Sequence, residues 1–342
     1  MTARVVVVDD SAVVRRALKA VLGGTPGIEV VGEAADPIEA RRVIQRCKPD
    51  VLTLDCEMPH LDGISFLKEI MESQPLPIVM VSSLTRKTSP VAFEAMRLGA
   101  VSVVSKPFAG YPLPAMLDDV RAAVLAAAQA NVRHTKNVSG GERAQSASAR
   151  LSESTLIVVG SSTGGTVAFE RFSRTLPEDS PCVLVAQHLP VGFVSRFAER
   201  LGRNLRHEVA VAQGGEVCRP GHIYLAPTEA HLRVRKRGAH FETELHATEK
   251  VNHHRPSVDV LMLSAAAAAR RAAVGVLLTG MGRDGAQGLL AMKAAGATTM
   301  VQDEASCSVF GMPKAALELG AANQAGDPEW LARQAMSAVA SG

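Results

Sequence analysis

The sequence reads LIVVGSSTGGT over residues 156–166. Four apolar residues closed by a glycine are typical of a buried parallel strand, and the segment from Thr166 onward, with Phe169 and Phe172 three residues apart, is typical of the helix that follows. The hydroxyl groups of this stretch are therefore expected on a turn between a strand and a helix. Backbone N–H groups at such a helix N-terminus can stabilise a ligand phosphate or the oxyanion of an acyl transfer.

Two phosphate-binding loops are excluded at this turn. A Walker A loop starting at Gly160 requires a lysine where the chain has Thr166, and a dinucleotide-binding fingerprint requires a glycine where the chain has Ser162. A serine on a glycine-flanked turn instead matches a nucleophile elbow, because small neighbours let a carbonyl approach the hydroxyl. A serine-rich turn that only caps a helix is the commoner alternative, so partner residues elsewhere in the chain must decide.

Length, charge and cysteine usage bound the class of protein. The 342 residues suggest about two domains. A net charge of +3 argues against nucleic-acid binding and against an anionic-membrane surface. The five cysteines form no C-x-x-C pair, which fits a reducing compartment. Because the N-terminus shows no signal peptide and no apolar stretch is long enough to span a membrane, we expect a cytoplasmic protein without membrane insertion.

Residues 1–130 are expected to form the first domain. Strand-like and helix-like segments alternate there, which predicts an α/β fold with a parallel sheet. A capping Asp36 before Pro37 marks one helix start. The five expected strands cover residues 4–8, 28–32, 51–54, 78–81 and 101–104.

Charged and hydroxyl side chains collect at the carboxyl ends of these strands, where ligands bind to open parallel sheets. Asp9 and Asp10 follow the first strand, Asp55 the third, Ser82 the fourth and Lys106 the fifth. The three carboxylates are suitable ligands for Mg²⁺. Asp55 could then accept a phosphoryl group, with Lys106 balancing its charge and the Ser82 hydroxyl moving towards the phosphate oxygens. Ordinary solvated strand ends are the less favoured alternative, because four ends supply the right chemistry at once.

The motifs of this domain resemble those of a known family. They are V-V-D-D-S at residues 7–11, L-D-C-E-M-P-x-x-D-G at 54–63, V-S-S at 81–83 and K-P-F at 106–108. Over about the first 125 residues the chain resembles a response-regulator receiver domain. The resemblance implies a flavodoxin-like fold with a five-stranded parallel sheet.

Residues 131–154 separate this domain from the remainder. They are polar and small without an apolar period, which favours a flexible linker, although a weakly helical basic tether is a competing interpretation. From residue 155 to 342 strands and helices alternate again. We therefore expect a second α/β domain.

Two more strand ends in the second domain carry partners for Ser162. His188 ends the strand that begins near residue 183, and Asp284 lies in a glycine-rich loop after a strand near residue 276. A histidine there can act as a general base, although a lone histidine is more often structural. Asp284 could hold the imidazole of His188 in the right tautomer, and the backbone of residues 280–282 could donate an N–H group to an oxyanion. The chain order Ser, His, Asp matches no standard hydrolase fold, so the inference depends on the roles alone.

These segments also resemble a known family. The relevant motifs are G-S-S-T-G-G, Q-H-L-P-x-G-F, Y-L-A-P, H-R-P-S-V-D, L-T-G-M-G-x-D-G and C-S-V-F-G-M-P. Together they resemble the catalytic domain of the chemotaxis protein-glutamate methylesterases, an α/β domain with a mainly parallel sheet. The two resemblances cover the whole chain apart from the linker.

The resemblance implies an esterase reaction. Ser162 would attack the γ-methyl ester of a glutamate on a methyl-accepting chemoreceptor, His188 would transfer the proton and Asp284 would orient His188. Met281 would lie at the oxyanion site. The family also deamidates receptor glutamines by the same acyl-enzyme route, and its esterase reaction needs no cofactor.

The resemblance also implies regulation. A chemotaxis histidine kinase would phosphorylate Asp55, with Mg²⁺ held by Asp9, Asp10 and Asp55, and the unphosphorylated receiver would restrain the active site. A non-catalytic signalling module, in which the serine turn only holds an anion, remains the alternative function.

Several residues have weaker predictions. Cys56 and Thr228 depart from the residues usual in these families, and Thr228 could strain a turn because threonine tolerates positive φ poorly. Arg255 and Asp259 could line the substrate cleft or form a structural ion pair. Residues 232–238 are expected to form one exposed hairpin strand. Solvated or locally bonded side chains are expected for His222, His231, His240, His246, His253 and His254.

Overall fold

The computed structural model describes residues 2–58, 61–82, 89–107, 112–130, 154–190 and 192–341. The chain divides into two compact units, Met1–Lys136 and Asn137–Gly342. The predicted linker at residues 131–154 lies outside the described residues, apart from Ser154. No helix in the described part is long and apolar enough to cross a membrane. All five cysteines are free thiols.

The described part of the first unit contains a five-stranded parallel sheet, as predicted. Its strands are β1 (Ala3–Val8), β2 (Ile28–Ala34), β3 (Val51–Asp55), β4 (Ile78–Ser82) and β5 (Ser102–Ser105). They lie in the order β2-β1-β3-β4-β5, which is the flavodoxin-like order. Val5 to Val8 of β1 are almost fully buried, which explains why this strand reads as a continuous apolar run.

Helices cover this sheet. They are α1 (Ala12–Gly23), α2 (Pro37–Cys47), α3 (Gly63–Ser73), α4 (Ser89–Arg97) and α5 (Leu113–Ala127). Helix α1 packs beside α5, and α3 packs beside α4. The predicted cap of α2 is confirmed, because the Asp36 side chain accepts a hydrogen bond from the Glu39 N–H at 2.8 Å.

The second unit is built on a seven-stranded sheet within the described residues. Its strands are all parallel and lie in the order β14-β13-β12-β6-β7-β9-β8. The chain starts at the central strand β6, runs to one edge, and then returns to the other side of β6. This change of direction at β6 creates a topological switch point, where open parallel sheets bind ligands. The strands are β6 (Leu156–Ser161), β7 (Cys182–Gln187), β8 (Glu208–Val211), β9 (His222–Leu225), β12 (Ala273–Leu277), β13 (Thr298–Gln302) and β14 (Gln324–Gly326).

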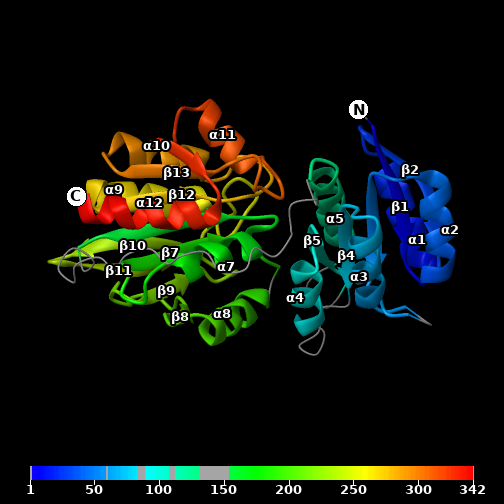
Figure 1. Cartoon of the computed structure of the whole chain (residues 1–342), viewed down its shortest axis with the longest axis horizontal. Coiled ribbons are helices and arrows are strands. Elements are labelled where there is room, and N and C mark those ends of the chain that lie inside the picture. The colour runs from blue at the N-terminus through cyan, green and yellow to red at the C-terminus, as the bar shows by residue number, and fades with distance from the viewer. Residues whose placement is uncertain are drawn as a thin grey trace. The chain divides into compact units, whose positions relative to one another are not determined.

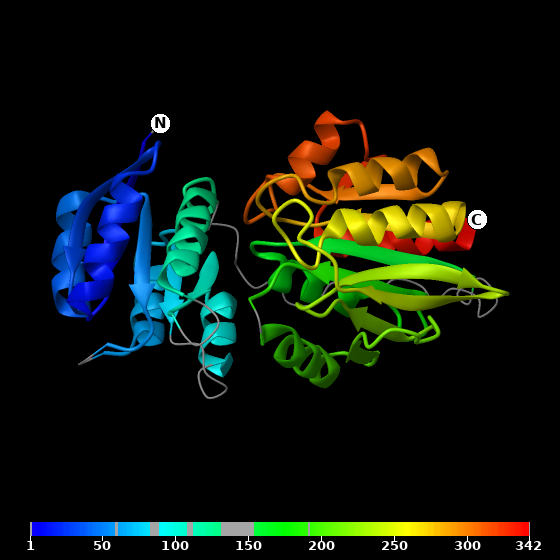
Figure 2. The ribbon, with the colours of Figure 1, turned by 180° about the vertical axis from the view of Figure 1, so that it is seen from behind.

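Helices lie on both faces of this sheet (Figure 1). Helix α12 packs against α7 and is nearer the viewer in Figure 1, whereas α9 packs against α10 and is nearer the viewer in Figure 2. The helices are α7 (Gly165–Thr175), α8 (Phe193–Asn204), α9 (Val258–Ala268), α10 (Ala286–Ala294), α11 (Met312–Glu318) and α12 (Pro328–Ser341), with a 3₁₀ turn at Arg270–Ala272.

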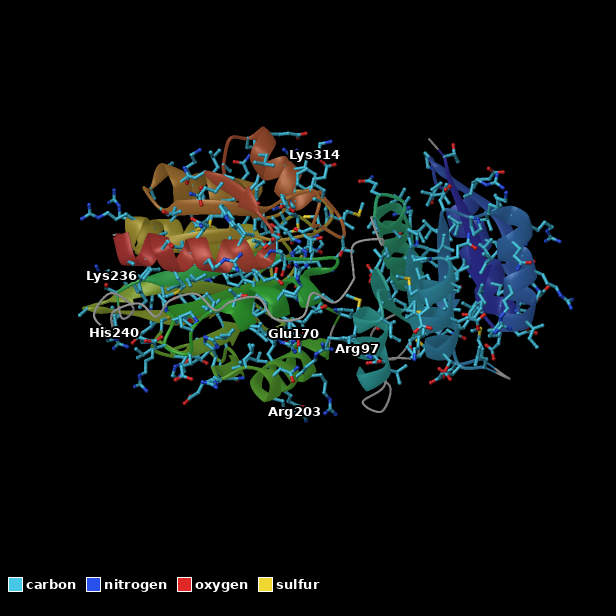
Figure 3. The ribbon with its side chains drawn as sticks, viewed as in Figure 1. Arg97, Glu170, Arg203, Lys236, His240 and Lys314 are labelled. Atoms are coloured by element: carbon cyan, nitrogen blue, oxygen red, sulfur yellow. The ribbon has the colours of Figure 1, made fainter. Side chains whose placement is uncertain are left out.

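An antiparallel hairpin, β10 (His231–Arg237) and β11 (His240–His246), packs against α9. Lys236 and His240 mark its far end in Figure 3. The prediction of a hairpin strand is confirmed, but the strand is not exposed throughout. Leu232 and Val234 are buried, and the Val234 N–H donates to Ser264 Oγ on α9 at 3.0 Å.

Glu170 on α7, labelled in Figure 3, joins α7 to α8. Its carboxylate accepts hydrogen bonds from Arg174 at 2.6 Å, Arg200 at 2.7 Å and Asn204 at 3.3 Å. Because the side chain is only 9% exposed, these donors replace the water that a charged group loses on burial. The ion network fixes the helix that follows the serine turn.

Gly160 lets α9 approach the central strand closely. A Cβ atom added at this position would lie 2.1 Å from Val258 Cγ1 and 3.0 Å from Leu277 Cδ1. Val258 is the first residue of α9. The N-terminus of α9 therefore reaches the carboxyl end of β6 only because the strand carries no side chain there.

We predict that Gly160→Ala destabilises the second unit by about 1–3 kcal/mol or more, because the new methyl group overpacks the contact with α9. Gly202→Ala is the matched control. Gly202 is an exposed residue within α8, its added Cβ would come no nearer than 4.0 Å to Val209 Cβ, and the change should stabilise the helix by about 0.5–1 kcal/mol. Chemical denaturation of both variants measures the difference; equal stabilities would contradict the packing argument.

Candidate active site

Three neighbouring strands place the three predicted catalytic residues. Ser162 follows β6, His188 follows β7 and Asp284 lies in the loop after β12, and β6 pairs with both other strands. The backbone ladder continues past the strand ends, since the His188 N–H donates to the Ser161 carbonyl and the Ser162 N–H donates to the Thr279 carbonyl, both at 3.0 Å. The sheet therefore holds all three positions at its carboxyl edge.

The side chains form a hydrogen-bonded line. His188 Nδ1 lies 3.1 Å from Ser162 Oγ, and His188 Nε2 lies 2.9 Å from Asp284 Oδ2. The His188 side chain is 9% exposed and that of Asp284 is 2% exposed. With the Nε2–H donating to Asp284, Nδ1 is left as an acceptor for the serine proton. This geometry provides a nucleophile, a base and an orienting acid.

The Asp284 carboxylate is surrounded by donors. Oδ2 accepts from the Val258 N–H at 2.7 Å in addition to His188, and Oδ1 accepts from Asn252 Nδ2, Ser257 Oγ and the Asp259 N–H at 2.8, 2.8 and 3.2 Å. Burial raises the pKa of this carboxyl group, but the hydrogen bonds and the charge of His188 outweigh it and hold the pKa well below its usual range. Two of the donors are N–H groups of the first turn of α9, whose N-terminus favours negative charge.

Gln187 holds the backbone on both sides of the site. Its Nε2 donates to the carbonyls of Ser162 and His188, each at 2.9 Å, and its Oε1 is the partner of the buried Ser161 hydroxyl. The Gln187 side chain is buried. One amide group thus fixes the spacing between the serine turn and the histidine.

The loop that contains Met281 lies against the serine. A Cβ atom added to Gly280 would lie 2.7 Å from Ser162 Cβ, so the preceding residue of this loop touches the serine directly. The Ser162 N–H already donates to the Thr279 carbonyl. Within the described residues, no hydrogen bond from the Met281 N–H is found. In this part of the structure the Met281 N–H therefore has no bonded acceptor that would compete with a ligand, whereas the Ser162 N–H has one.

The first unit gathers its predicted acidic residues at the same kind of edge. Asp9, Asp10 and Asp55 have oxygen atoms within 4.8 Å of one another. Lys106 Nζ lies 2.7 Å from Asp55 Oδ2 and 3.1 Å from Asp9 Oδ2. Ser82 is the last residue of the neighbouring strand β4. Its hydroxyl is buried and has no hydrogen-bond partner of ordinary geometry in the described part of the unit. Every residue predicted for this site is present at one edge.

Burial governs the electrostatics of this second cluster. It raises the pKa of Asp55 to about 6, with the charge of Asp9 acting in the same direction and the ion pair with Lys106 opposing it. The pKa of Asp9 is also raised by burial. Burial lowers the pKa of Lys106, but both carboxylates outweigh it and the net shift is upward. Carboxylates that lose water in this way gain from a divalent cation.

Comparisons with known proteins identify the families of both units. Residues 157–335 match the family described as "CheB methylesterase", and residues 5–118 match the one described as "Response regulator receiver domain". The chain belongs to the CheB methylesterase family. The expected family resemblances are thereby confirmed.

Relatives of this CheB-family chain extend over nearly its whole length. A protein from Nitrosomonas europaea named "Protein-glutamate methylesterase/protein-glutamine glutaminase" is 47% identical over 94% of this chain and 92% of its own length. A protein of the same name from Paraburkholderia xenovorans is 46% identical over 99% of this chain and 97% of its own. The crystal structure of the Thermotoga maritima CheB methylesterase catalytic domain is 33% identical with a TM-score of 0.52, covering 54% of this chain and 97% of that one.

One histidine of this CheB-family site was missed by the sequence prediction. The ring of His254 stacks on that of His188, with centroids 3.7 Å apart and an angle of 13° between the planes. The expectation of a solvated or locally bonded side chain is therefore wrong for His254. It is also wrong for His231, which is buried and bonds to the Glu249 carbonyl and the Ser257 N–H, 18 and 26 residues away. It is confirmed for His240, which bonds to Glu242 two residues away. The H-R-P-S-V-D motif was the available signal, since it begins at His254.

Two other expectations are corrected. Arg255 donates to the Thr248 carbonyl, whereas Asp259 accepts from Asn252 and from the Gly288 N–H, so these two residues do not form the ion pair considered from the sequence. The φ angle of Thr228 is not positive, so the backbone strain considered from the sequence is absent at this residue. Its hydroxyl donates to the Glu229 carboxylate.

We predict that Asp284→Asn lowers kcat by about 10³–10⁴-fold. The asparagine amide can adopt two orientations. In one its NH₂ faces the Val258 N–H, and in the other it faces the Asp259 N–H, so two donors meet in both. The same clash should lower the melting temperature, since an unsatisfied buried donor costs about 1–3 kcal/mol. Asp327→Asn is the control, because Asp327 caps α12 by accepting from the Trp330 N–H and asparagine caps equally well. A variant at Asp284 with normal rate and stability would refute the assignment.

Proposed function

We propose that this chain is a phosphorylation-activated serine esterase. It hydrolyses glutamate γ-methyl esters on chemoreceptors, releases methanol, and deamidates receptor glutamines. The line of hydrogen bonds from Ser162 through His188 to Asp284, at the ends of three adjacent strands, is the observation that carries this proposal. Membership of the methylesterase family and the attached receiver domain support the substrate class and the regulation.

In the first half of the reaction, Ser162 Oγ attacks the ester carbonyl carbon while His188 Nδ1 takes the hydroxyl proton. Asp284 stabilises the imidazolium that forms, through its bond to Nε2. When the tetrahedral intermediate collapses, the C–O bond to the methoxy group breaks and His188 returns the proton to it as methanol. The product is an acyl-enzyme on Ser162.

The second half regenerates the serine. Water gives a proton to His188 Nδ1 as its oxygen attacks the acyl carbon, and collapse of this intermediate returns the proton to Ser162 and leaves a glutamate carboxyl group. With a glutamine substrate, the same steps release ammonia in place of methanol. No cofactor is needed for either substrate.

The oxyanion of each intermediate would be stabilised by the Met281 N–H and by the N-terminus of α7, which begins at Gly165 just after the serine. Gly164 adopts φ 77° there, a conformation that glycine accepts without strain. Each well-placed donor of this kind contributes about 10²–10³-fold to kcat.

Asp55 is the proposed phosphorylation site. Asp9, Asp10 and Asp55 would hold Mg²⁺, and this cluster of closely spaced oxygen atoms fits a hard divalent cation. When bound, the cation neutralises charge on the incoming phosphoryl group. Lys106 would balance the charge of the phosphorylated Asp55, and the Ser82 hydroxyl is available to bond the new phosphate oxygens.

The proposed partners follow from these two reactions. A chemotaxis histidine kinase supplies the phosphoryl group, and methyl-accepting chemoreceptors supply the ester. For both reactions we propose a location in the cytoplasm and no nucleic-acid partner. The domain boundaries at residues 1–130, 131–154 and 155–342 remain our proposed division of the chain.

We predict that Ser162→Ala lowers methanol release from a methylated receptor cytoplasmic fragment by at least about 10³-fold, because alanine has no hydroxyl group to form the acyl-enzyme. Ser337→Ala is the control, since the Ser337 hydroxyl donates to the Arg333 carbonyl on α12, away from the three strand ends. Methanol release by folded wild-type protein must be established first. If wild type releases none from several receptor types, with or without phosphodonor, the non-catalytic signalling module becomes the better proposal.

We predict that Asp55→Asn removes stimulation by a small-molecule phosphodonor with Mg²⁺ while basal turnover stays within about two-fold. If about 1% of the resting enzyme is active, the wild type gains at most about 100-fold. Asp118→Asn, at an exposed residue of α5 paired with Arg121, should keep the full stimulation. Full stimulation of the Asp55 variant would show that another residue accepts the phosphoryl group.

A further inference from the structure

A tight turn at residues 251–254 reaches the active site. Val251 and His254 exchange both backbone hydrogen bonds, at 3.0 and 2.9 Å. The two central residues, Asn252 and His253, have φ values of 53° and 68°. Asparagine and histidine enter this left-handed region more readily than most residues, so the sequence suits the turn.

Asn252 fixes this turn to the catalytic acid. Its Nδ2 donates to Asp284 Oδ1 at 2.8 Å and to Asp259 Oδ2 at 2.7 Å. The turn is thereby attached to the same carboxylate that orients His188. Two residues later the chain lays the ring of His254 on the ring of His188.

The stacked ring restrains a motion that the hydrogen bonds of His188 leave free. The bonds at Nδ1 and Nε2 lie in the plane of the imidazole and join it to Ser162 and Asp284. They do not prevent the ring from rocking about the line between them. The ring of His254 prevents this rocking, because its centroid lies 3.7 Å from that of His188 and the two planes differ by only 13°. In the described part of the chain the ring nitrogens of His254 make no hydrogen bond, so the contact with His188 uses its face alone.

His254 stays uncharged at neutral pH. Burial lowers its pKa to about 3, positive charge on His188, His253 and Lys250 acts in the same direction, and Asp284 opposes them. Two charged imidazoles in face contact would repel each other strongly. The pair therefore carries at most one positive charge, on His188 when it takes the serine proton. A neutral aromatic face stabilises a cation lying on it.

We propose that His254 is a positioning residue of the esterase, whose neutral ring holds His188 in the plane of its two hydrogen bonds and stabilises it when protonated. This inference rests on the proposed esterase function. It assigns a use to a histidine outside the triad and a reason for the Asn252 turn.

Three variants of the full-length protein test the proposal by methanol release from a methylated receptor fragment. His254→Ala removes the ring face and should lower kcat about ten-fold, with KM within about two-fold. His254→Phe keeps a flat aromatic face without nitrogen atoms and should retain kcat within about three-fold. His253→Asn, a change that suits φ 68°, should match the wild type. The proposal is overturned if the alanine variant has wild-type kcat, or if phenylalanine is as slow as alanine, since the ring nitrogens would then be what matters.

An NMR measurement keeps the test valid if the alanine variant does not fold. In the wild type and in His254→Phe, the ring current of residue 254 should shift the carbon-bound ring protons of His188 upfield from their free-imidazole positions. Unshifted protons in folded wild type would overturn the proposal without any assay. Failure of the esterase function itself looks different, because the wild type would then release no methanol whatever residue 254 is.

Discussion

The buried carboxylate of Asp284 is the constraint on which the rest of the catalytic unit depends. A charge at 2% exposure is stable only if donors replace its lost water, and five of them do so. Two come from the first turn of α9, so this helix must begin beside the sheet. It can begin there because Gly160 leaves room for Val258. The buried Asp284 carboxylate thus accounts for the position of α9, for the glycine at residue 160 of β6 and for the orientation of His188.

The receiver unit treats its buried acids differently. At its strand edge Lys106 is the donor that faces both Asp55 and Asp9. Lys106 lowers the pKa values of both acids, but burial outweighs it and both pKa values stay raised. The Asp284 carboxylate keeps its charge because donors within the protein replace its water, whereas the receiver acids have fewer such donors and raised pKa values. The first arrangement favours a permanent structural role for the carboxylate, and the second favours acids that gain from binding a cation or a phosphoryl group.

Much of this could be predicted from the sequence. Parallel strands buried on both faces read as continuous apolar runs, and the residue just after each run lies at the carboxyl edge. Ser162, His188, Asp55 and Lys106 could therefore be located without a structure. The resemblance to known families then assigned roles that position alone left open, above all that of Met281.

The remaining part of the site could not be predicted, because its contacts join distant segments through side chains that follow no period. Asn252 reaches Asp284 across 32 positions, and His254 meets His188 through a turn that only left-handed backbone at two residues makes possible. A histidine among several in one segment gives no sign of which one packs on the base. The conformation expected at Thr228 was wrong for a related reason, since family preference at a position does not fix the backbone of this chain.

The two edge strands of the seven-stranded sheet are short, and this limits aggregation of the protein through its sheet edges. β14 has three residues and β8 has four, so each edge offers few unpaired backbone groups to another chain. Glu208 adds a charge at the start of β8. Long apolar strands such as β6 and β7 lie inside the sheet, where a second copy cannot pair with them. Short edges of this kind oppose strand-to-strand aggregation, which otherwise threatens a parallel sheet whose interior is so apolar.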